Sequence, residues 1–209
     1  MTVVIYVHGL WLNGRESLFL RRRIEATLQA PVHAFSYPSV AATMQNITAQ
    51  LADFVVEHGA SELHFVGHSL GGLVIYRFLE RYPEQVPGRV VFLGTPAVAS
   101  RAAQGVSRLR WLAPLLGRTV ADELLSVRER RWIHADRALG VIAGSRPMGL
   151  GQFFTRFEED SDGTVAVSET RIPGATDAVT LPVSHMGLLL SARVADETAR
   201  FLQRGRFGL

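Results

Sequence analysis

Short runs of apolar residues recur along the chain, and most of them are continuous rather than alternating with polar positions. The runs cover Val3–Val7, Val32–Tyr37, Leu63–Val66, Val90–Leu93, Leu139–Ala143 and Ala178–Leu181. They are rich in β-branched residues, which are frequent in strands. Continuous apolar character is typical of strands that are buried on both faces of a parallel sheet. The pattern therefore predicts about six parallel strands.

Longer amphipathic segments separate these runs. In each segment apolar residues recur at steps of three and four, which is the pattern of one helix face. The recurring positions are Leu20, Ile24 and Leu28, then Met44, Ile47, Leu51, Phe54, Val55 and His58, and finally Met186, Leu190, Val194, Phe201 and Leu202. Another helix is expected over Leu73–Tyr82, ended by Pro83. Strands separated by helices predict right-handed crossovers and an α/β fold with a doubly wound, mostly parallel sheet.

Two stretches interrupt this alternation. Residues 97–131 contain leucines among arginines and no strand pattern, which indicates one or two helices inserted after the fourth strand. Two interpretations of this insertion stay open, a short lid and a surface helix that covers the sheet. Phe157–Thr170 is acidic and then polar, and it predicts a loop that leads into a short turn or helix. No repeat or linker divides the sequence, so we expect a single domain over residues 1–209.

Composition changes this picture mainly by excluding chemistry. Of the 209 residues, 47% are hydrophobic and 20% are charged, as in globular proteins. There is no cysteine, and all 22 basic residues are arginines. Disulfides, thiolate metal sites, a cysteine nucleophile and a Schiff-base lysine are therefore excluded. The net charge is only +3 and no basic stretch is interleaved with aromatic residues, so we expect no nucleic-acid partner.

The N-terminal residues predict a first strand rather than a targeting segment. They lack the basic region and the small-residue cleavage site of a signal peptide. The sequence also has no run of 18 apolar residues that could span a membrane. We therefore expect a cytoplasmic protein without an integral membrane segment.

The sharpest chemical signal is Gly67-His68-Ser69-Leu70-Gly71, which lies between a predicted strand and a predicted helix. This context is the one that a nucleophile elbow requires. Glycines permit the tight turn, the serine is held in a strained conformation, and the helix that follows favours negative charge near its N-terminus. We interpret Ser69 as a nucleophile. The alternative is a glycine-rich turn without chemistry.

A serine nucleophile needs a base, and the base needs an acid to orient it. In folds with this elbow the chain order is serine, acid, histidine, and only His134 and His185 follow Ser69. His134 precedes a strand, at the wrong edge of the sheet, whereas His185 follows the last strand, so we predict His185 as the base. Asp162, in the turn Asp162-Gly163-Thr164-Val165, is the predicted acid, and Asp160 is its main rival.

The remaining site predictions concern the oxyanion and the substrate. Two backbone N–H groups are expected to bind the oxyanion, from Leu70 after the nucleophile and from Leu10 after the first strand. His8 is interpreted as structural, because it precedes the serine in the chain. Four residues flank the proposed site and are candidates to line a substrate pocket: Trp11, Leu12, Thr95 and Met186.

No metal or other cofactor is predicted. His64 and His68 are four residues apart, but that spacing brings two ligands together only on a helix. His64 lies in a predicted strand and His68 in the turn after it. Their spacing therefore does not indicate a metal site.

Taken together, His8-Gly9, the elbow with Gly72, Gly94-Thr95-Pro96, Asp162-Gly163-Thr164-Val165 and Ser184-His185-Met186 resemble the α/β-hydrolase superfamily. Within it the chain is similar to small bacterial lipase-like esterases and to acyl hydrolases related to lecithin–cholesterol acyltransferase and the GPI-inositol deacylase. The resemblance implies hydrolysis of a small-molecule or lipid-like carboxylic ester through an acyl-enzyme, without a cofactor. The chain is short for the superfamily and leaves no room for a full cap domain.

Other functions are compatible with the same residues. A thioesterase, an amidase or an acyltransferase would use the same serine, histidine and aspartate. A catalytically silent hydrolase fold that serves as a binding module is the alternative outside enzymes. An intact set of three residues in the expected order favours an enzyme over this module.

Overall fold

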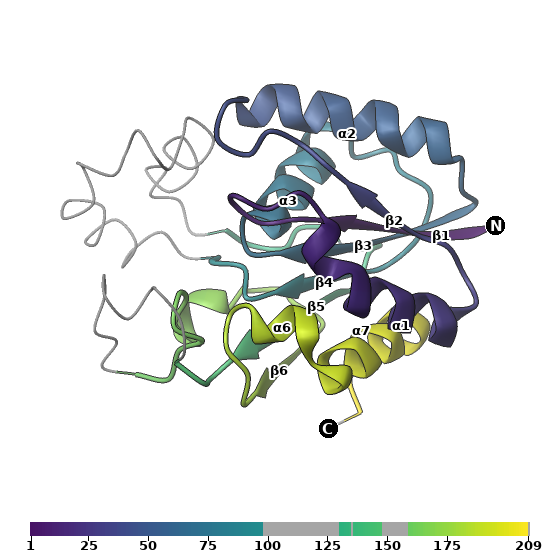
Figure 1. The fold of residues 1–209 in the computed structure, drawn as a ribbon. Coiled ribbons are helices and arrows are strands. Elements are labelled where there is room, and N and C mark those ends of the chain that lie inside the picture. The colour runs from purple at the N-terminus through teal and green to yellow at the C-terminus, as the bar shows by residue number, and fades with distance from the viewer. Residues whose placement is uncertain (98–129, 135, 148–158, 209) are drawn as a thin grey trace.

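A parallel sheet forms the centre of the computed structural model, which describes residues 1–97, 130–134, 136–147 and 159–208 (Figure 1). Its strands are β1 (Thr2–Val7), β2 (Val32–Phe35), β3 (Glu62–His68), β4 (Val90–Leu93), β5 (Leu139–Gly144) and β6 (Asp177–Leu181). The strands lie in the order β2-β1-β3-β4-β5-β6, and each neighbouring pair is parallel. The predicted α/β fold with a sheet of about six parallel strands is confirmed.

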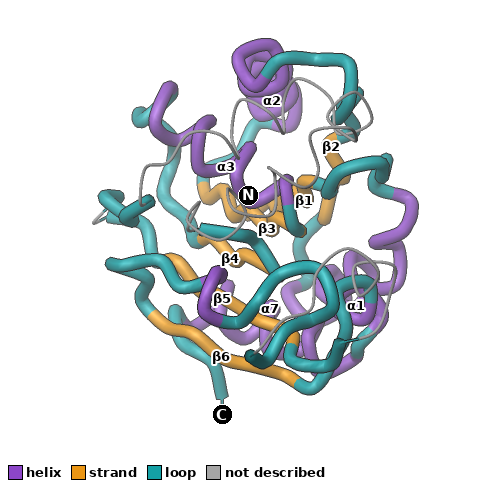
Figure 2. Tube along the Cα trace, turned by 90° about the vertical axis from the view of Figure 1, so that its left-hand side faces the viewer, coloured by secondary structure: helices purple, strands orange, loops and turns teal. Residues whose placement is uncertain are grey.

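Helices cover both faces of this sheet. Figures 1 and 2 show α2 (Met44–His58) and α3 (Leu70–Arg81) on one face, and α1 (Leu18–Leu28) and α7 (Ala192–Arg204) on the other. Successive residues of β1 enter the two cores in turn. Val3, Ile5 and Val7 pack towards α2 and α3, and Val4 and Tyr6 pack towards α1 and α7. This arrangement explains why the strand is apolar at every position rather than at alternate ones.

Strand order changes direction between β1 and β3, since the chain first adds β2 on one side of β1 and then β3 on the other. In open α/β sheets, ligands bind outside the carboxyl ends of the strands at such a switch point. The turn after β1 and the turn after β3 meet there, because Val7 and Gly67 are register partners in neighbouring strands. The fold thus brings Gly9 and Ser69 to one edge of the sheet.

The C-terminal segment departs from the predicted single helix. The structure has two helices here, α6 (Gly187–Leu190) and α7, separated at Ser191. Ser191 adopts an extended backbone, and its hydroxyl accepts the Val194 N–H at 3.4 Å as the N-cap of α7. Met186 and Leu190 are therefore not on the buried stripe of the long helix, and they are 44% and 64% exposed.

The insertion predicted at residues 97–131, the possible lid, lies almost entirely outside the described residues. The loop predicted up to Thr170 is described from residue 159 onward and ends in the short 3₁₀ helix η4 (Ser168–Thr170). Another 3₁₀ helix, η1 (Arg15–Ser17), precedes α1. Within the described residues no helix is long and apolar enough to cross a membrane.

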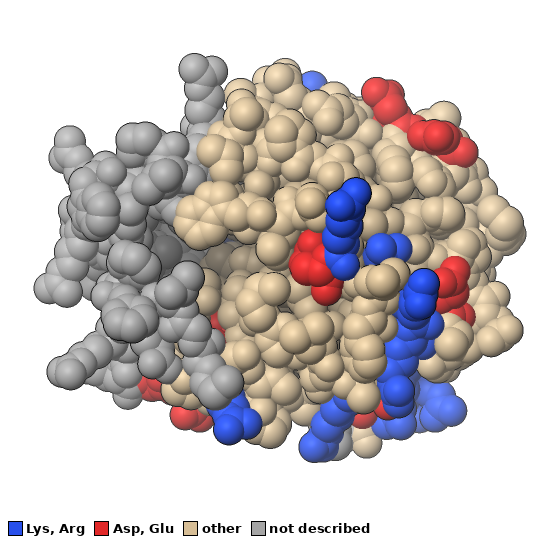
Figure 3. Space-filling model, viewed as in Figure 1, with Lys and Arg blue, Asp and Glu red and all other residues tan. Residues whose placement is uncertain are grey.

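Charges of both signs are interspersed on the face that carries α1 and α7 (Figure 3). Arg23 of α1 forms an ion pair with Asp196 of α7 at 2.6 Å. The described part of this face therefore presents a surface of mixed charge.

Candidate active site

Ser69 occupies a sharp turn between β3 and α3. Its backbone angles are φ 53° and ψ −122°, in a region that residues with a side chain rarely adopt. Gly71 permits the turn, because a Cβ at that position would overlap the Val7 carbonyl oxygen. Gly67 permits it too, since a Cβ there would lie 2.6 Å from Gly72. The predicted elbow thus has a strained serine at its apex, as functional sites often do.

The structure brings the predicted base and acid into direct contact. His185 Nδ1 and Asp162 Oδ2 are 2.6 Å apart, and Asp162 is 1% exposed. The other carboxylate oxygen of Asp162 accepts the N–H groups of Thr164 and Val165, both at 2.8 Å. Because the Asp162 carboxylate oxygen Oδ2 accepts the hydrogen bond with His185, Nδ1 of His185 carries the ring proton. Nε2 is then left with a lone pair that can accept a proton.

Gly94, at the end of β4, makes room for this pair. Its φ is +56°, and a Cβ there would lie 2.9 Å from Asp162 Oδ2 and 3.2 Å from His185 Nδ1. Any side chain at this position would displace the hydrogen-bonded pair. The sequence marks Gly94-Thr95-Pro96 only as a family signal, and this steric requirement comes from the tertiary contact alone.

Thr95 lies under the elbow. The residue is fully buried, and its hydroxyl donates to the Ser69 carbonyl at 3.0 Å. The sequence suggested a substrate contact for Thr95. The observed hydrogen bond instead gives this side chain a role in holding the backbone of Ser69.

His68 contacts the proposed base from the strand that precedes the nucleophile. Its ring centroid lies 4.7 Å from that of His185, and its Nε2–H donates to the His185 carbonyl at 3.1 Å. Burial, together with the nearby His185, lowers the pKa of His68 well below its ordinary value. A neutral His68 adds no positive charge beside the base. Sequence reasoning missed this contact, although a histidine next to the nucleophile was a visible signal.

The two histidines considered as a metal pair are kept apart by the strand. His64 and His68 both lie on β3, where four residues span roughly 13 Å. His64 Nδ1 instead accepts a hydrogen bond from the backbone N–H of Arg89 at 2.8 Å.

The loop after β1 packs directly against the nucleophile. A Cβ on Gly9 would lie 3.1 Å from Ser69 Cβ, so only glycine permits this approach without displacement. Leu10 follows Gly9 and is partly buried against the core on the α2 and α3 side. On the other side of the nucleophile, the N–H of Leu70 lies in the first turn of α3, where it has no acceptor within the helix.

The other predicted pocket residues lie around this loop and at α6. Trp11 is 65% exposed, and its N–H donates to Ser39 Oγ at 3.0 Å. Leu12 packs partly against the α1 and α7 core, and Met186 at the start of α6 is 44% exposed. Exposed apolar surface on Trp11 and Met186 suits a substrate contact better than the buried Thr95 does.

Within the described residues no hydrogen bond joins Ser69 Oγ to the His185 ring. Hydrogen bonds between a nucleophile and its base are often long without substrate and tighten in the Michaelis complex. The contact between His185 and Asp162 is therefore formed in the structure, and Ser69 lies on a neighbouring turn without a hydrogen bond to the His185 ring.

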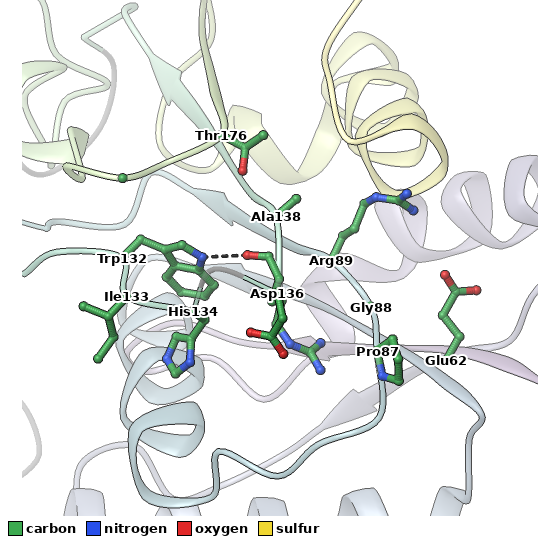
Figure 4. Close-up of a pocket in the computed structure, with 12 residues that line it drawn as sticks. Glu62, Pro87, Gly88, Arg89, Trp132, Ile133, His134, Asp136, Ala138 and Thr176 are labelled. Atoms are coloured by element: carbon green, nitrogen blue, oxygen red, sulfur yellow. Dashed lines mark hydrogen bonds between the residues drawn. The ribbon is translucent and has the colours of Figure 1, made fainter.

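A cavity of about 630 Å³ lies at the opposite, amino edge of the sheet (Figure 4). His134 borders it, beside the start of β5. Two buried polar side chains around it bond to the main chain: Trp132 Nε1 donates to the Arg137 carbonyl at 2.7 Å, and Arg137 Nη1 donates to the Leu63 carbonyl at 2.8 Å. Ser69, Asp162 and His185 lie at the opposite, carboxyl edge, which is the candidate active site.

Comparison with known proteins agrees with this fold. Residues 4–204 match the Alpha/beta hydrolase family, and the chain belongs to that family. Its sequence is similar to 2-succinyl-6-hydroxy-2,4-cyclohexadiene-1-carboxylate synthase of Serratia proteamaculans, with 30% identity over 111 residues. That match covers 51% of this chain and only 43% of the relative.

Solved structures of similar fold include hydrolases. The pyrethroid hydrolase PytH has a TM-score of 0.69 at 16% identity, with 98% of this chain and 99% of that chain covered. Phospholipase PlaB from Legionella pneumophila has a TM-score of 0.71 at 17% identity, with 97% and 58% covered. The Vlm2 thioesterase domain has a TM-score of 0.53 at 13% identity, with 97% and 92% covered. At these identities the likeness concerns the fold.

Proposed function

We propose that this protein is a serine hydrolase that cleaves carboxylic esters through an acyl-enzyme, with Ser69 as nucleophile, His185 as base and Asp162 as the acid that orients the base. The observation that carries the proposal is the buried 2.6 Å contact between His185 Nδ1 and Asp162 Oδ2, at the sheet edge where Ser69 occupies its strained turn. Two named neighbours, a pyrethroid hydrolase and a phospholipase, support ester cleavage by analogy. The motif resemblance favours a lipase-like esterase acting on small-molecule or lipid-like esters.

The chemistry proceeds in two halves. His185 Nε2 accepts the Ser69 hydroxyl proton as the oxygen attacks the ester carbonyl, and the N–H groups of Leu10 and Leu70 bind the oxyanion. His185 then gives this proton to the departing alcohol, which leaves an acyl group on Ser69. A water molecule attacks the acyl group as His185 takes its proton. The intermediate then collapses to release the acid, and His185 returns the proton to the Ser69 oxygen. Asp162 stabilises the imidazolium throughout and stays ionised.

Hydrolysis of p-nitrophenyl butyrate by the purified protein tests the proposal. We expect a burst of about one p-nitrophenolate per protein if deacylation is slow, and turnover that falls on the order of a millionfold in Ser69→Ala. The matched control is Ser61→Ala, an exposed serine at the other edge of the sheet. Hydrolysis that persists in Ser69→Ala would contradict the proposal.

Esters, thioesters and anilides of the same acyl group distinguish the related activities. An esterase is expected to have its highest kcat/KM on the ester, after correction for the intrinsic reactivity of each leaving group. A clear preference for the thioester would instead indicate a thioesterase with the same residues. Turnover of none of them by folded protein would favour a silent binding module.

A further inference from the structure

His8 is fully buried, and its hydrogen bonds fix which ring nitrogen carries the proton. Nδ1 lies 2.7 Å from the Gly9 carbonyl oxygen, which can only accept, so Nδ1 is protonated. Nε2 lies 3.2 Å from the Tyr37 N–H, which can only donate, so Nε2 carries the lone pair. The ring is therefore neutral, in a single tautomer, and it connects two backbone groups.

The bond to Gly9 fixes the plane of the next peptide group. The Gly9 carbonyl and the Leu10 N–H belong to one trans peptide unit, and in such a unit they point in opposite directions. Holding the carbonyl towards the buried His8 ring therefore turns the Leu10 N–H away from that ring. A second and longer bond supports the same orientation, since the Leu12 N–H donates to the Gly9 carbonyl at 3.4 Å.

Tyr37, just beyond β2, holds His8 from the other side. The Tyr37 hydroxyl donates to the His8 carbonyl at 2.8 Å, and the two rings stack with centroids 4.2 Å apart and 11° between their planes. Tyr37 is 4% exposed, and burial raises its pKa, so the hydroxyl stays protonated and able to donate. Ser39, two residues later, accepts the Trp11 N–H. The segment after β2 thus fixes the loop after β1 at both ends.

We propose that His8 and Tyr37 are positioning residues of the oxyanion hole, which act by holding the Gly9–Leu10 peptide so that the Leu10 N–H faces the reacting carbonyl. The inference rests on the proposed function, because it assumes that Leu10 donates to an oxyanion formed at Ser69. It extends that function by giving His8 a defined task. His8 forms no bond with the substrate and transfers no proton.

The decisive variants separate the two bonds of the His8 ring. His8→Ala removes both bonds. His8→Asn retains a side-chain N–H near the position of Nδ1, so it can still donate to the Gly9 carbonyl. Tyr37→Phe keeps the stacked ring and removes only the hydroxyl. His64→Asn is the matched control, because His64 is also a buried histidine that accepts a backbone N–H, but at the opposite edge.

The first readout is kcat and KM on p-nitrophenyl butyrate. The second is the inhibition constant of butylboronic acid, whose tetrahedral adduct with serine places an oxygen in the oxyanion hole. In His8→Ala we expect kcat to fall on the order of a hundredfold, as for loss of one oxyanion donor. KM should change little, and the boronic acid constant should rise by a factor similar to the loss in kcat. His8→Asn should recover most of the loss in kcat and most of the loss in boronic acid binding. Tyr37→Phe should lose roughly tenfold in kcat. His64→Asn should match wild type in both measurements.

Two results would overturn the inference. One is a kcat in His8→Ala within a few-fold of wild type. The other is a loss that His8→Asn does not relieve, or that leaves boronic acid inhibition unchanged, since that pattern indicates general damage to the fold. If His8→Ala does not fold, His8→Asn and Tyr37→Phe decide by the same two measurements. Failure of the proposed function is recognised separately, by wild-type protein that has no activity dependent on Ser69.

Discussion

The two edges of the sheet contain similar residues that make different contacts. At the amino edge, the side chains of His64, Arg137 and Trp132 form hydrogen bonds with backbone N–H and carbonyl groups. At the carboxyl edge, Asp162 and His185 bond to each other through their side chains. The backbone of Ser69 is also strained there, with a φ of 53° and a ψ of −122°.

Under the proposed function, this difference distinguishes the reactive site from a structural one in this molecule. A buried polar side chain that bonds to the main chain stabilises the fold, and its loss leaves backbone groups unpaired. In the proposed mechanism the side-chain pair beside the strained serine serves chemistry, because it fixes the proton position on one group for use by another. Residue type alone does not separate the two cases, since both edges contain buried histidines.

The largest effect should come from the acid. Asp162→Asn removes the charge that fixes the tautomer of His185, and we expect kcat to fall roughly ten-thousandfold. Asp160→Asn is the matched control, because Asp160 is exposed and, among the described residues, its one hydrogen bond is from the Val167 N–H to its backbone carbonyl. Steady-state kinetics on one ester substrate measures both variants. A small effect at Asp162 beside a large one at Asp160 would reverse the assignment of the acid.

A smaller effect should follow from filling the space beside the pair. Gly94→Ala places a Cβ 2.9 Å from Asp162 Oδ2 at a positive φ. We expect kcat to fall on the order of a hundredfold through misplacement of the base and stability to fall by roughly 1–3 kcal/mol.

Gly59→Ala is the control for strain alone, since Gly59 also has a positive φ but no atom within 4 Å of an added Cβ. The kcat of Gly59→Ala should match that of wild type, while urea unfolding should show a measurable loss of stability. Equal kinetic losses in both glycine variants would remove the steric explanation.

At the amino edge the expected effect is on stability only. Arg137→Met leaves the buried Leu63 carbonyl, and the partly buried Val86 carbonyl, without the donor that Arg137 supplies. We expect the free energy of unfolding to fall by roughly 2–4 kcal/mol, while kcat at a temperature where the variant is folded stays unchanged. Chemical unfolding and initial rates on the same sample measure the two quantities. A selective loss of kcat would mean that the amino edge contributes to the chemistry.

The smallest effect concerns pH. Burial lowers the pKa of His64 to about 4, from its ordinary value near 6.5. Between these values the unfolded chain binds the proton that the folded protein excludes, so stability rises with pH through this window and is lost as pH falls. Buried His8 and His68 act in the same direction.

Replacing His64 by asparagine should therefore flatten the dependence of unfolding free energy on pH between pH 6.5 and pH 4, relative to wild type. Urea unfolding at several pH values measures the slope. A slope that is identical in His64→Asn and wild type would show that His64 does not titrate as its burial implies.

Much of the fold could be predicted from the sequence, because it depends on local pattern. Continuous apolar runs predicted every strand of the described sheet, and steps of three and four predicted α1, α2 and α3. The division at Ser191 was missed, because the apolar spacing continues across a residue whose backbone is extended. β6 also differs from the expectation, since partly buried and exposed residues alternate along this edge strand and only Leu181 is fully buried.

The candidate site was predictable where motif and chain order carry the information, and not where distant segments meet. The pairing of Asp162 with His185 was expected from their order after Ser69. The space that Gly94 leaves for them and the bond from Thr95 to Ser69 were not, because neither can be read without the tertiary arrangement. His8 was interpreted as structural, and the structure shows which backbone groups its ring connects, the Gly9 carbonyl and the Tyr37 N–H.

Covalent labelling with a fluorophosphonate tests the central claim most directly, because the probe reacts only with an activated serine. Intact mass and peptide mapping should find one adduct, on Ser69, in wild type and in His134→Ala. The adduct should be absent in His185→Ala. An adduct on another residue, labelling that survives in His185→Ala, or folded wild-type protein that reacts with neither this probe nor a smaller one would contradict the account.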